Sequence, residues 1–262
     1  RKQKITPVAG DEVTLETENG AAVIAQIAPR KNVFVRPPVA NLDVLFLVAS
    51  TTQPTPSTLV LDKLSAIAVD KGVQPVVVCT KSDLAEADFL ANAYAKSTLP
   101  FIRIDYEGGA GLDEVKQWIN GRLCAFCGNS GVGKSSILNA LDPRFSLAVG
   151  EVSKALGRGR HTTRHVELFS LGEDTYIIDT PGFSSFDTAE MDLALKQHLP
   201  ETFPEFAPYV DQCRFTGCTH TKEKGCRVLQ AVKDGLIPVS RHRSYVRLFD
   251  ELKDVKEWQQ KK

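Results

Sequence analysis

Several features are missing from this chain of 262 residues, and each absence excludes a class of protein. It contains no run of about 18 apolar residues, so we expect no transmembrane helix. Neither sign of charge dominates, because 32 Lys and Arg balance 32 Asp and Glu. A uniformly basic nucleic-acid binder is therefore excluded. Hydrophobic residues make up 42%, which is enough to bury a core and excludes a long disordered chain.

The zero net charge conceals an uneven distribution along the chain. Residues 171–212 hold one Lys against nine acids, whereas residues 213–262 hold twelve Lys or Arg against six acids. Such a basic segment can bind phosphate backbones in a salt-dependent way. We therefore expect local basic patches at the C-terminal end.

The six cysteines do not form the pattern of a disulfide framework. Cys79, Cys124 and Cys127 lie singly in apolar runs, where a buried small hydrophobe is expected. The other three surround a histidine in the spacing C-x4-C-x-H-x5-C, with the ligands Cys213, Cys218, His220 and Cys226. Three thiolates and one imidazole match a closed tetrahedral zinc site. A disulfide with one leftover thiol, or buried cysteines beside an unrelated histidine, are the alternatives.

The first 38 residues predict a small β-rich unit. Strands are expected at 11–16, 23–27 and 32–35, and Asn19-Gly20 is a strong hairpin signal. Three strands are too few to close a barrel of about five strands, so we expect either a small sheet or a partial barrel that lacks its front. Pro37-Pro38 indicates a boundary.

The central part of the chain alternates strands and helices. Apolar strands are expected at 42–48, 75–79, 123–127 and 176–179, with helices at 59–69, 86–96, 113–120 and 136–141. This alternation predicts an α/β fold with a parallel sheet. From about residue 200 onward only helices are expected, at 227–234 and 240–260. The predicted segments are thus 1–38, 39–199 and 200–262.

A glycine-rich loop follows the third strand and fits G-x-x-x-x-G-K-S. It comprises Gly128, Asn129, Ser130, Gly131, Val132, Gly133, Lys134 and Ser135, with Ser136 opening the next helix. Small residues let backbone N–H groups surround a phosphate chain, the lysine reaches the β- and γ-phosphates, and the serine hydroxyl binds Mg²⁺. The alternative is a chance glycine-rich turn, which the strand before it and the helix after it disfavour.

Two further motifs agree with a nucleotide site. Asp179-Thr180-Pro181-Gly182 ends an apolar strand, where the acid can hold Mg²⁺ and the glycine N–H can sense a γ-phosphate. Between this motif and the phosphate loop, the loop 157–165 contains Thr162 and Thr163, and we favour Thr163 as the residue that closes over Mg²⁺. An ordinary turn and an exposed basic loop are the respective alternatives.

The residues Thr80, Lys81, Ser82 and Asp83 follow the second strand and match the guanine motif [N/T]-K-x-D. A carboxylate there accepts two N–H bonds from guanine, which adenine cannot supply. A simple helix N-cap is the alternative. In an ordinary GTPase this motif follows the phosphate loop, but here it precedes it, which indicates a circular permutation.

Together, the permuted motifs, the preceding β-rich segment and the C-x4-C-x-H-x5-C cluster resemble the RsgA/YjeQ family of circularly permuted GTPases. The resemblance implies an OB-fold, a permuted GTPase domain and a helical zinc domain. It also implies that the protein acts in late maturation of the small (30S) ribosomal subunit. The protein would contact the 16S-type rRNA of that subunit and hydrolyse GTP in a reaction that the subunit stimulates. Zn²⁺ and Mg²⁺ with GTP or GDP are the expected ligands; Ser135, Thr163 and Asp179 would hold the magnesium.

The sequence departs from the family pattern in two places. The segment Asp105-Tyr106-Glu107-Gly108-Gly109-Ala110-Gly111-Leu112 stands where S-A-x-x-G-x-G-L is expected. Phe183 stands where many GTPases have a glutamine that orients water, so slow intrinsic turnover is expected. His161 is the nearest candidate for that role.

The resemblance and the absence of a membrane span together set the expected partners and compartment. We expect a monomer in the bacterial cytoplasm, with a plastid as the alternative compartment. A non-enzymatic rRNA-docking factor that uses guanine nucleotide only as a switch is the alternative function, because Phe183 cannot polarise water. An ATP-using P-loop protein is a third option, which Asp83 disfavours.

Overall fold

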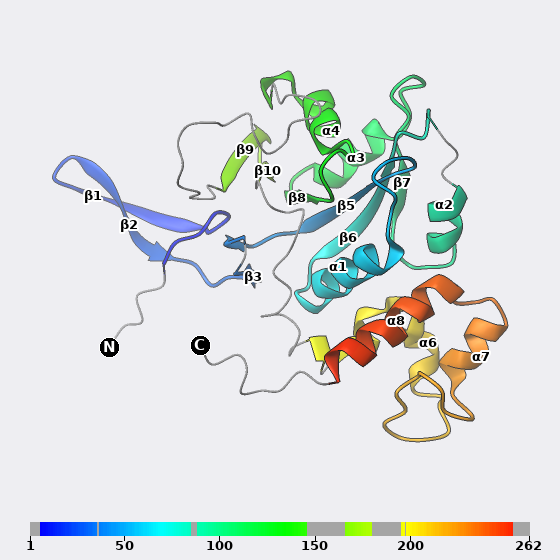
Figure 1. The fold of residues 1–262 in the computed structure, drawn as a ribbon. Coiled ribbons are helices and arrows are strands. Elements are labelled where there is room, and N and C mark those ends of the chain that lie inside the picture. Colours follow the sequence, from blue (N-terminus) through cyan, green and yellow to red (C-terminus); the bar gives the residue numbers. More distant parts are fainter. Residues whose placement is uncertain are drawn as a thin grey trace.

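The computed structural model describes residues 6–35, 37–84, 88–145, 166–179, 195–196 and 198–253. A six-stranded sheet in the order β7-β6-β5-β8-β10-β9 forms its centre (Figure 1). Its strands are β5 (Val44–Ser50), β6 (Gln74–Thr80), β7 (Phe101–Arg103), β8 (Leu123–Cys127), β9 (Glu167–Gly172) and β10 (Thr175–Asp179). Only β9 runs antiparallel to its neighbour. The predicted α/β parallel sheet is confirmed.

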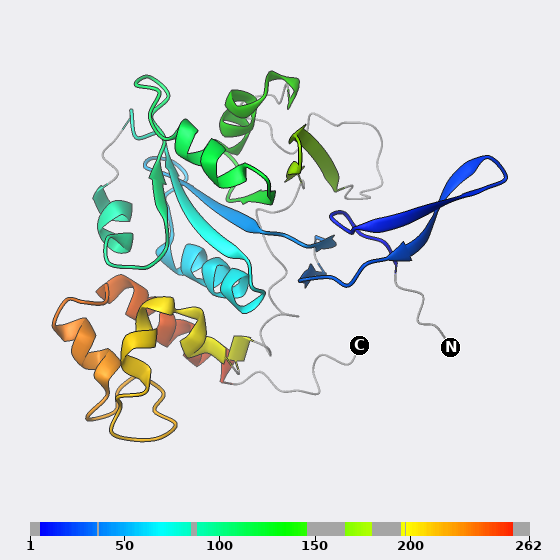
Figure 2. The same cartoon turned by 180° about the vertical axis from the view of Figure 1, so that it is seen from behind.

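The central strands β5, β6 and β8 are almost entirely buried and largely apolar because helices cover both faces of the sheet (Figures 1 and 2). All seven residues of β5 are buried, and alternate side chains enter two separate cores. Val44, Phe46 and Val48 pack with α3 (Leu112–Ile119) and α4 (Lys134–Leu141), where Phe46 stacks on Phe126. Leu45, Leu47 and Ala49 pack on the opposite face, which α1 (Thr58–Asp70) covers.

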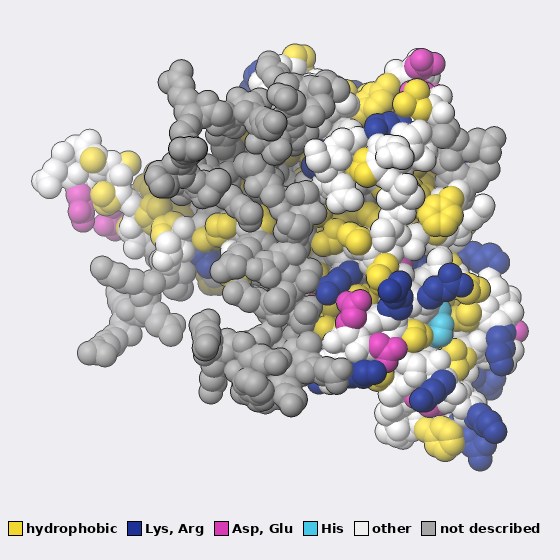
Figure 3. All heavy atoms as spheres, viewed as in Figure 1, with side chains coloured by type: hydrophobic (Ala, Val, Ile, Leu, Met, Phe, Trp, Pro, Cys, Tyr) yellow, Lys and Arg dark blue, Asp and Glu magenta, His cyan; other side chains and the backbone are white. Residues whose placement is uncertain are grey.

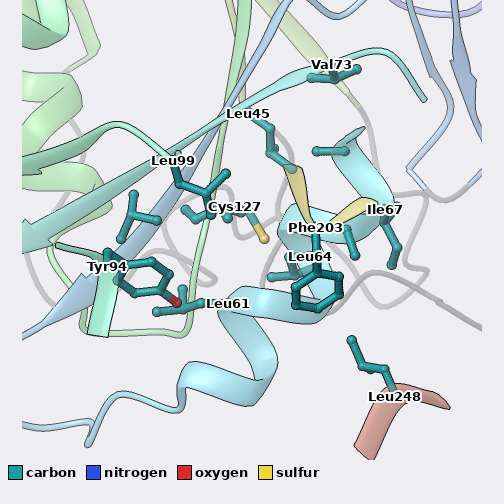
Figure 4. Packing of buried hydrophobic residues seen from close by; sticks show 14 of the residues in the cluster. Leu45, Leu61, Leu64, Ile67, Val73, Tyr94, Leu99, Cys127, Phe203 and Leu248 are labelled. Carbon is teal, nitrogen blue, oxygen red and sulfur yellow. The ribbon is translucent and has the colours of Figure 1, made fainter. Parts of the chain in front are cut away.

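The C-terminal module, residues 198–253, completes the core on the α1 side. It contains η3 (Leu199–Thr202), η4 (Pro204–Phe206), α6 (Ala207–Val210), α7 (Arg227–Lys233) and α8 (Val239–Leu252). Figure 4 shows Phe203 and Leu248 of this module beside Leu61 and Leu64 of α1, in one continuous apolar cluster. The module therefore shares its core with the sheet domain.

A buried ion network also joins the module to α1. The Arg241 guanidinium of α8 donates to both carboxylate oxygens of Glu205, at 2.6 and 3.2 Å, and to Asp62 Oδ1 of α1 at 2.7 Å. The Tyr94 hydroxyl, at the end of α2 (Asp88–Tyr94), donates to the same Asp62 oxygen at 2.9 Å. Arg241, Asp62 and Glu205 side chains are at most 3% exposed. Charges buried in this way are tolerated because each one has partners.

The N-terminal residues form two short antiparallel pairs. The hairpin of β1 (Val13–Glu18) and β2 (Ala21–Ile27) turns at Asn19 and Gly20, both with positive φ, as Asn-Gly predicts. Figure 1 shows it projecting from the body, and Leu15 on it is 59% exposed. Within the described residues these pairs do not close a barrel, and the partial OB-fold stays a prediction.

The second pair, β3 (Val33–Phe34) and β4 (Val39–Ala40), spans the predicted boundary at residue 38. Element ends also differ from expectation by a few residues. The helix predicted from residue 136 begins at Lys134, and the helix predicted at 240–260 covers Val239–Leu252 in the described part. No helix within the described ranges is long and apolar enough to cross a bilayer.

Candidate functional site: three loops at one edge of the sheet

The predicted phosphate loop connects β8 to α4, with residues 128–133 between them. Two positions of this loop require glycine, because neighbouring atoms leave too little room for a Cβ. A Cβ on Gly128 would lie 2.3 Å from the Val48 carbonyl oxygen, and Gly133 has a φ of 97° with Thr80 3.3 Å from a Cβ there. The sequence therefore folds the loop tightly against β5 and β6: residues 128–133 form the loop, and residues 134–136 begin α4.

The chemistry of this loop fits a phosphate and a magnesium ion. The Lys134 ammonium lies over the loop and donates to the carbonyl oxygens of Gly128 and Asn129. The Ser135 hydroxyl is buried and has no hydrogen-bond partner among the residues that the structure describes. A buried polar atom without a partner is costly. This hydroxyl therefore fits the ligand that Mg²⁺ would take, since magnesium prefers oxygen donors.

The predicted guanine motif lies beside this loop, at the end of β6. The buried Thr80 hydroxyl donates to the Val132 carbonyl oxygen at 2.5 Å, which ties the two motifs together. Lys81 has a φ of 57°, and its ammonium donates to the Gln53 carbonyl oxygen at 2.8 Å. Ser82 donates to the Ile104 carbonyl oxygen at 2.6 Å. Asp83 is exposed and is therefore accessible to a base.

The third motif begins at Asp179, the last residue of β10. Because β10 and β8 are parallel neighbours, Asp179 closes its strand at the same edge as the phosphate loop. The carboxyl ends of strands at such an edge are where ligands bind in open α/β sheets. Thr162, Thr163, Gly182 and the candidate His161 lie outside the described residues, as does Phe183.

The predicted metal ligands come together in the C-terminal module. The ligand atoms of Cys213, Cys218, His220 and Cys226 all lie within 4.8 Å of one another. Zn–S bonds of about 2.3 Å and Zn–N bonds of about 2.0 Å at tetrahedral angles give S···S near 3.8 Å and S···N near 3.5 Å. The observed Cys213–Cys226 separation is 3.8 Å, and His220 Nδ1 lies 3.6 and 3.5 Å from those two sulfurs. All six cysteines are free, so the disulfide alternative is wrong for the described residues.

The chemistry of this cluster also favours a cation. Burial, together with the neighbouring Cys226 and Cys213 thiols, raises the pKa of Cys218 to about 12. Burial lowers the pKa of His220, which keeps the imidazole neutral as a metal ligand requires. Deprotonating three adjacent thiols would require a compensating positive charge, which a Zn²⁺ ion would supply.

Residues around the cluster hold its loop in shape. The Glu223 carboxylate accepts from the backbone N–H groups of Thr219, Thr221 and Lys222 at 3.0–3.1 Å. Burial opposes ionisation of Glu223, but these hydrogen bonds together with that of the Thr219 hydroxyl prevail and lower its pKa to about 2. The Tyr245 hydroxyl donates to the Thr219 carbonyl oxygen at 2.8 Å. Such outer partners orient metal ligands.

Sequence reasoning missed several of these partners. Neither the Thr80 tie to the phosphate loop nor the Gln53 contact with Lys81 has a motif of its own. Glu223 could have been found, because it lies between two predicted ligands. Tyr106 had a visible signal, an aromatic residue where the family pattern has alanine.

The fold and the site define a class of protein: a circularly permuted P-loop GTPase. The guanine motif precedes the phosphate loop in sequence, yet both meet at one edge of a sheet with Asp179 beside them. The motifs thus occur in a permuted order along the chain but lie together in space, as a circular permutation requires.

The chain belongs to the RsgA GTPase family, whose model matches residues 27–189. A small ribosomal subunit biogenesis GTPase RsgA from Ruminiclostridium cellulolyticum is 37% identical over all of this chain and 87% of its own length. The protein of that name from Carboxydothermus hydrogenoformans is 40% identical over 96% of this chain and 87% of its own length. The predicted family and the predicted enzyme class, a GTPase, are confirmed.

Solved structures agree with this assignment. YjeQ from Thermotoga maritima is 32% identical, covers 97% of this chain and 87% of its own, and superposes with a TM-score of 0.77. YloQ, described as a circularly permuted GTPase, is 34% identical with a TM-score of 0.76, over 98% of this chain and 84% of its own. These matches confirm the permuted α/β fold.

Proposed function

We propose that this chain hydrolyses GTP during maturation of the small ribosomal subunit, which is the process named for its relatives. One observation carries the proposal: the Thr80–Val132 hydrogen bond joins the guanine motif to the phosphate loop, next to the Ser135 hydroxyl, which has no partner in the described part of the chain. A loop that holds phosphates and a motif that selects guanine must lie this close to act on one nucleotide.

Within this site, Lys134 would hold the β- and γ-phosphates, and Asp83 would select guanine. Mg²⁺, when bound with GTP, neutralises the charge that develops on the phosphate oxygens. Ser135, Thr163 and Asp179 would hold it. The roles of Thr162 as part of the switch pair, Gly182 as γ-phosphate sensor and His161 as the water-orienting residue stay part of the proposal. They rest on sequence position alone.

The C-terminal module would bind one structural Zn²⁺ through its three cysteines and His220. The separations among Cys213, Cys226 and His220 support this, because they match tetrahedral zinc, and Cys218 lies within 4.8 Å of all three. All four positions are filled by protein atoms, which leaves none open for substrate. We therefore assign this metal a folding role.

The same module offers a surface for rRNA. A hollow of about 630 Å³ beside the cluster is lined by basic side chains, namely Arg214, Lys222, Lys224, Arg227 and Lys233. Glu223 also lines it, but its carboxylate is turned to backbone N–H groups. Figure 3 shows lysines and arginines gathered over this end of the molecule. A phosphate backbone is the partner that such a surface fits.

The remaining parts of the proposal concern architecture and location. Residues 1–38 would form part of an OB-fold, 39–199 the permuted GTPase domain and 200–262 the zinc domain. We propose a monomer in the bacterial cytoplasm. The relatives named above are all bacterial, which supports this compartment over a plastid.

The test is GTP and ATP turnover, each with and without small ribosomal subunits. We expect slow GTP hydrolysis alone, at least tenfold stimulation by the subunit, and no comparable ATP turnover. A matched Lys134→Ala variant should lose the stimulated activity. Tight GTP binding without any stimulated turnover would favour the non-enzymatic switch, and equal use of ATP would favour the third option. A His161→Ala variant with normal stimulated turnover would remove that residue from the mechanism.

A further inference from the structure

We propose that Tyr106 is a positioning residue of the nucleotide site, which ties the base-binding side to the phosphate loop. The inference rests on the proposed guanine site. Tyr106 lies in the turn 105–111 that follows β7, and its ring packs against the core under α3 and α4. Its hydroxyl donates to the Gly133 carbonyl oxygen at 3.5 Å, a long hydrogen bond. The phenol therefore reaches the start of the helix that carries Lys134 and Ser135.

The turn that carries Tyr106 is itself fixed. Asp105 Oδ1 accepts from the backbone N–H groups of Glu107 and Gly108, both at 2.9 Å. Gly111 has a φ of 86°, and a Cβ there would lie 1.9 Å from the Arg103 carbonyl oxygen. The Asp105 hydrogen bonds and the conformation at Gly111 fix this turn. The Tyr106 hydroxyl is therefore held in a fixed position against the phosphate loop.

Two hydroxyls thus contact two consecutive carbonyl groups of the phosphate loop, Thr80 closely and Tyr106 at the longer distance of 3.5 Å. Thr80, from the guanine motif, binds Val132, and Tyr106, from the next turn along the edge, contacts Gly133. Burial, with a smaller contribution from nearby Asp83, raises the pKa of Tyr106 to about 12. The phenol is therefore a neutral donor at physiological pH, and it lies close to the carboxylate proposed to read the base.

This placement predicts an effect on binding, not on chemistry. The hydroxyl sets the spacing between the base side and the phosphate side, which GTP and GDP must both span. Removing it should weaken both nucleotides by the same factor. The bond-breaking step lies at the γ-phosphate, so turnover at saturating GTP should not change.

The test compares Tyr106→Phe, which removes only the hydroxyl, with Tyr209→Phe, a half-buried tyrosine of the C-terminal module. For Tyr106→Phe we expect Kd for GTP and GDP and the KM for GTP to rise about 3- to 10-fold, the value of one hydrogen bond, with kcat unchanged. Tyr209→Phe should match the unmodified protein. Tyr106→Ala, which also removes the ring, should raise the Kd further.

Unchanged GTP and GDP affinity in Tyr106→Phe would overturn this inference alone. So would a lowered melting temperature with normal affinity, or a fall in kcat at constant KM. Failure of the unmodified protein to prefer GTP over ATP would overturn the proposed guanine site as well.

Discussion

The phosphate loop and the C-terminal module bury polar groups to a similar degree but treat them in opposite ways. Ser135 is 3% exposed and its hydroxyl has no partner within the described ranges, whereas Arg241 is 1% exposed and donates to Glu205, Asp62 and Ser65. A bound ligand would satisfy the Ser135 hydroxyl, whereas the Asp62 carboxylate, whose Oδ2 also has no partner among the described residues, is already held through Oδ1 by Arg241 and Tyr94. This difference indicates that the phosphate loop is completed by a ligand, whereas the ion network of the C-terminal module is satisfied by residues of the chain itself.

The largest effect expected from this comparison concerns the zinc ligands. A Cys226→Ser variant should bind no zinc and lose the fold of residues 213–226, since structural zinc binding contributes on the order of 10 kcal/mol to folding. Metal content by atomic absorption and near-UV circular dichroism measure it. A Cys79→Ser variant is the matched control, because that buried cysteine lies in the sheet, and its zinc content should stay at one. Full zinc retention in Cys226→Ser would contradict the assignment.

The next largest effect concerns the buried ion network. Arg241→Met should lower the free energy of unfolding by about 3–5 kcal/mol, because it leaves the Asp62 and Glu205 carboxylates buried without their cation. Urea denaturation measures it. Arg243→Met, an exposed position on the same helix, should change stability by less than about 0.5 kcal/mol. A loss below about 1 kcal/mol at Arg241 would show that the network does not hold the module to α1.

A second test replaces the two acidic partners of Arg241 together with Arg241 itself. Asp62→Leu and Glu205→Leu combined with Arg241→Met should recover most of the lost stability, since apolar replacement of a whole buried ion network is often neutral. The triple variant, measured by the same denaturation, separates the cost of an unpaired charge from the cost of lost packing. A triple variant as unstable as the single one would favour packing.

Substituting Ser135 should have the opposite effect on stability from substituting Arg241. Ser135→Ala should leave the free energy of unfolding within about 1 kcal/mol of the original or raise it, because it removes a buried hydroxyl without a partner. GTP affinity in the presence of Mg²⁺ should nevertheless fall at least tenfold. Ser135→Thr is the control that keeps the hydroxyl. Normal Mg²⁺-dependent GTP binding by the alanine variant would show that this hydroxyl holds no magnesium.

The smallest effect concerns acid sensitivity of the N-terminal pairs. Arg30 donates to both Asp11 oxygens at 2.6 and 2.8 Å. These bonds outweigh burial and hold the pKa of Asp11 below its ordinary value of 3.8. A lowered folded-state pKa stabilises the fold above pH 3.8, and that contribution is lost as the pH falls below it.

Asp11→Asn should therefore loosen residues 6–40 at neutral pH by about 1 kcal/mol and remove part of their acid sensitivity. Hydrogen exchange of the β1–β2 amides between pH 3 and pH 7 measures this. Glu16→Gln, on the exposed side of the same hairpin, is the control. Identical pH profiles for Asp11→Asn and the original protein would contradict the role of this pair.

The sequence predicted the parts of this molecule that depend on local pattern. Continuous apolar strands, glycines before Lys134 and the spacing of the cysteines each follow from what neighbouring residues must do. The central strands are confirmed, and the three cysteines and His220 lie together, while the roles of these site residues stay predictions. Asn19-Gly20 likewise predicted its turn. The exact ends of α4 and α8 were missed, because capping and packing extend or shorten a helix by a few residues.

The rest could not be predicted because it depends on residues far apart in the chain. Arg241 binds Asp62 across 179 positions, and neither residue has a motif around it. Thr80, at the end of β6, and Tyr106, in the turn after β7, both contact the phosphate loop, which no local spacing indicates. Where the guanine site deviates from its family pattern, at 105–112, only the fold showed what the aromatic side chain contacts.

Hydrogen exchange with and without GTP and Mg²⁺ tests the contrast between the two regions most directly. We predict that amides of residues 128–136 gain strong protection on binding, whereas those of α7 and α8 are already protected and do not change. ATP with Mg²⁺ should produce no such gain. Protection spread evenly over the C-terminal module, or none at the phosphate loop, would contradict the account.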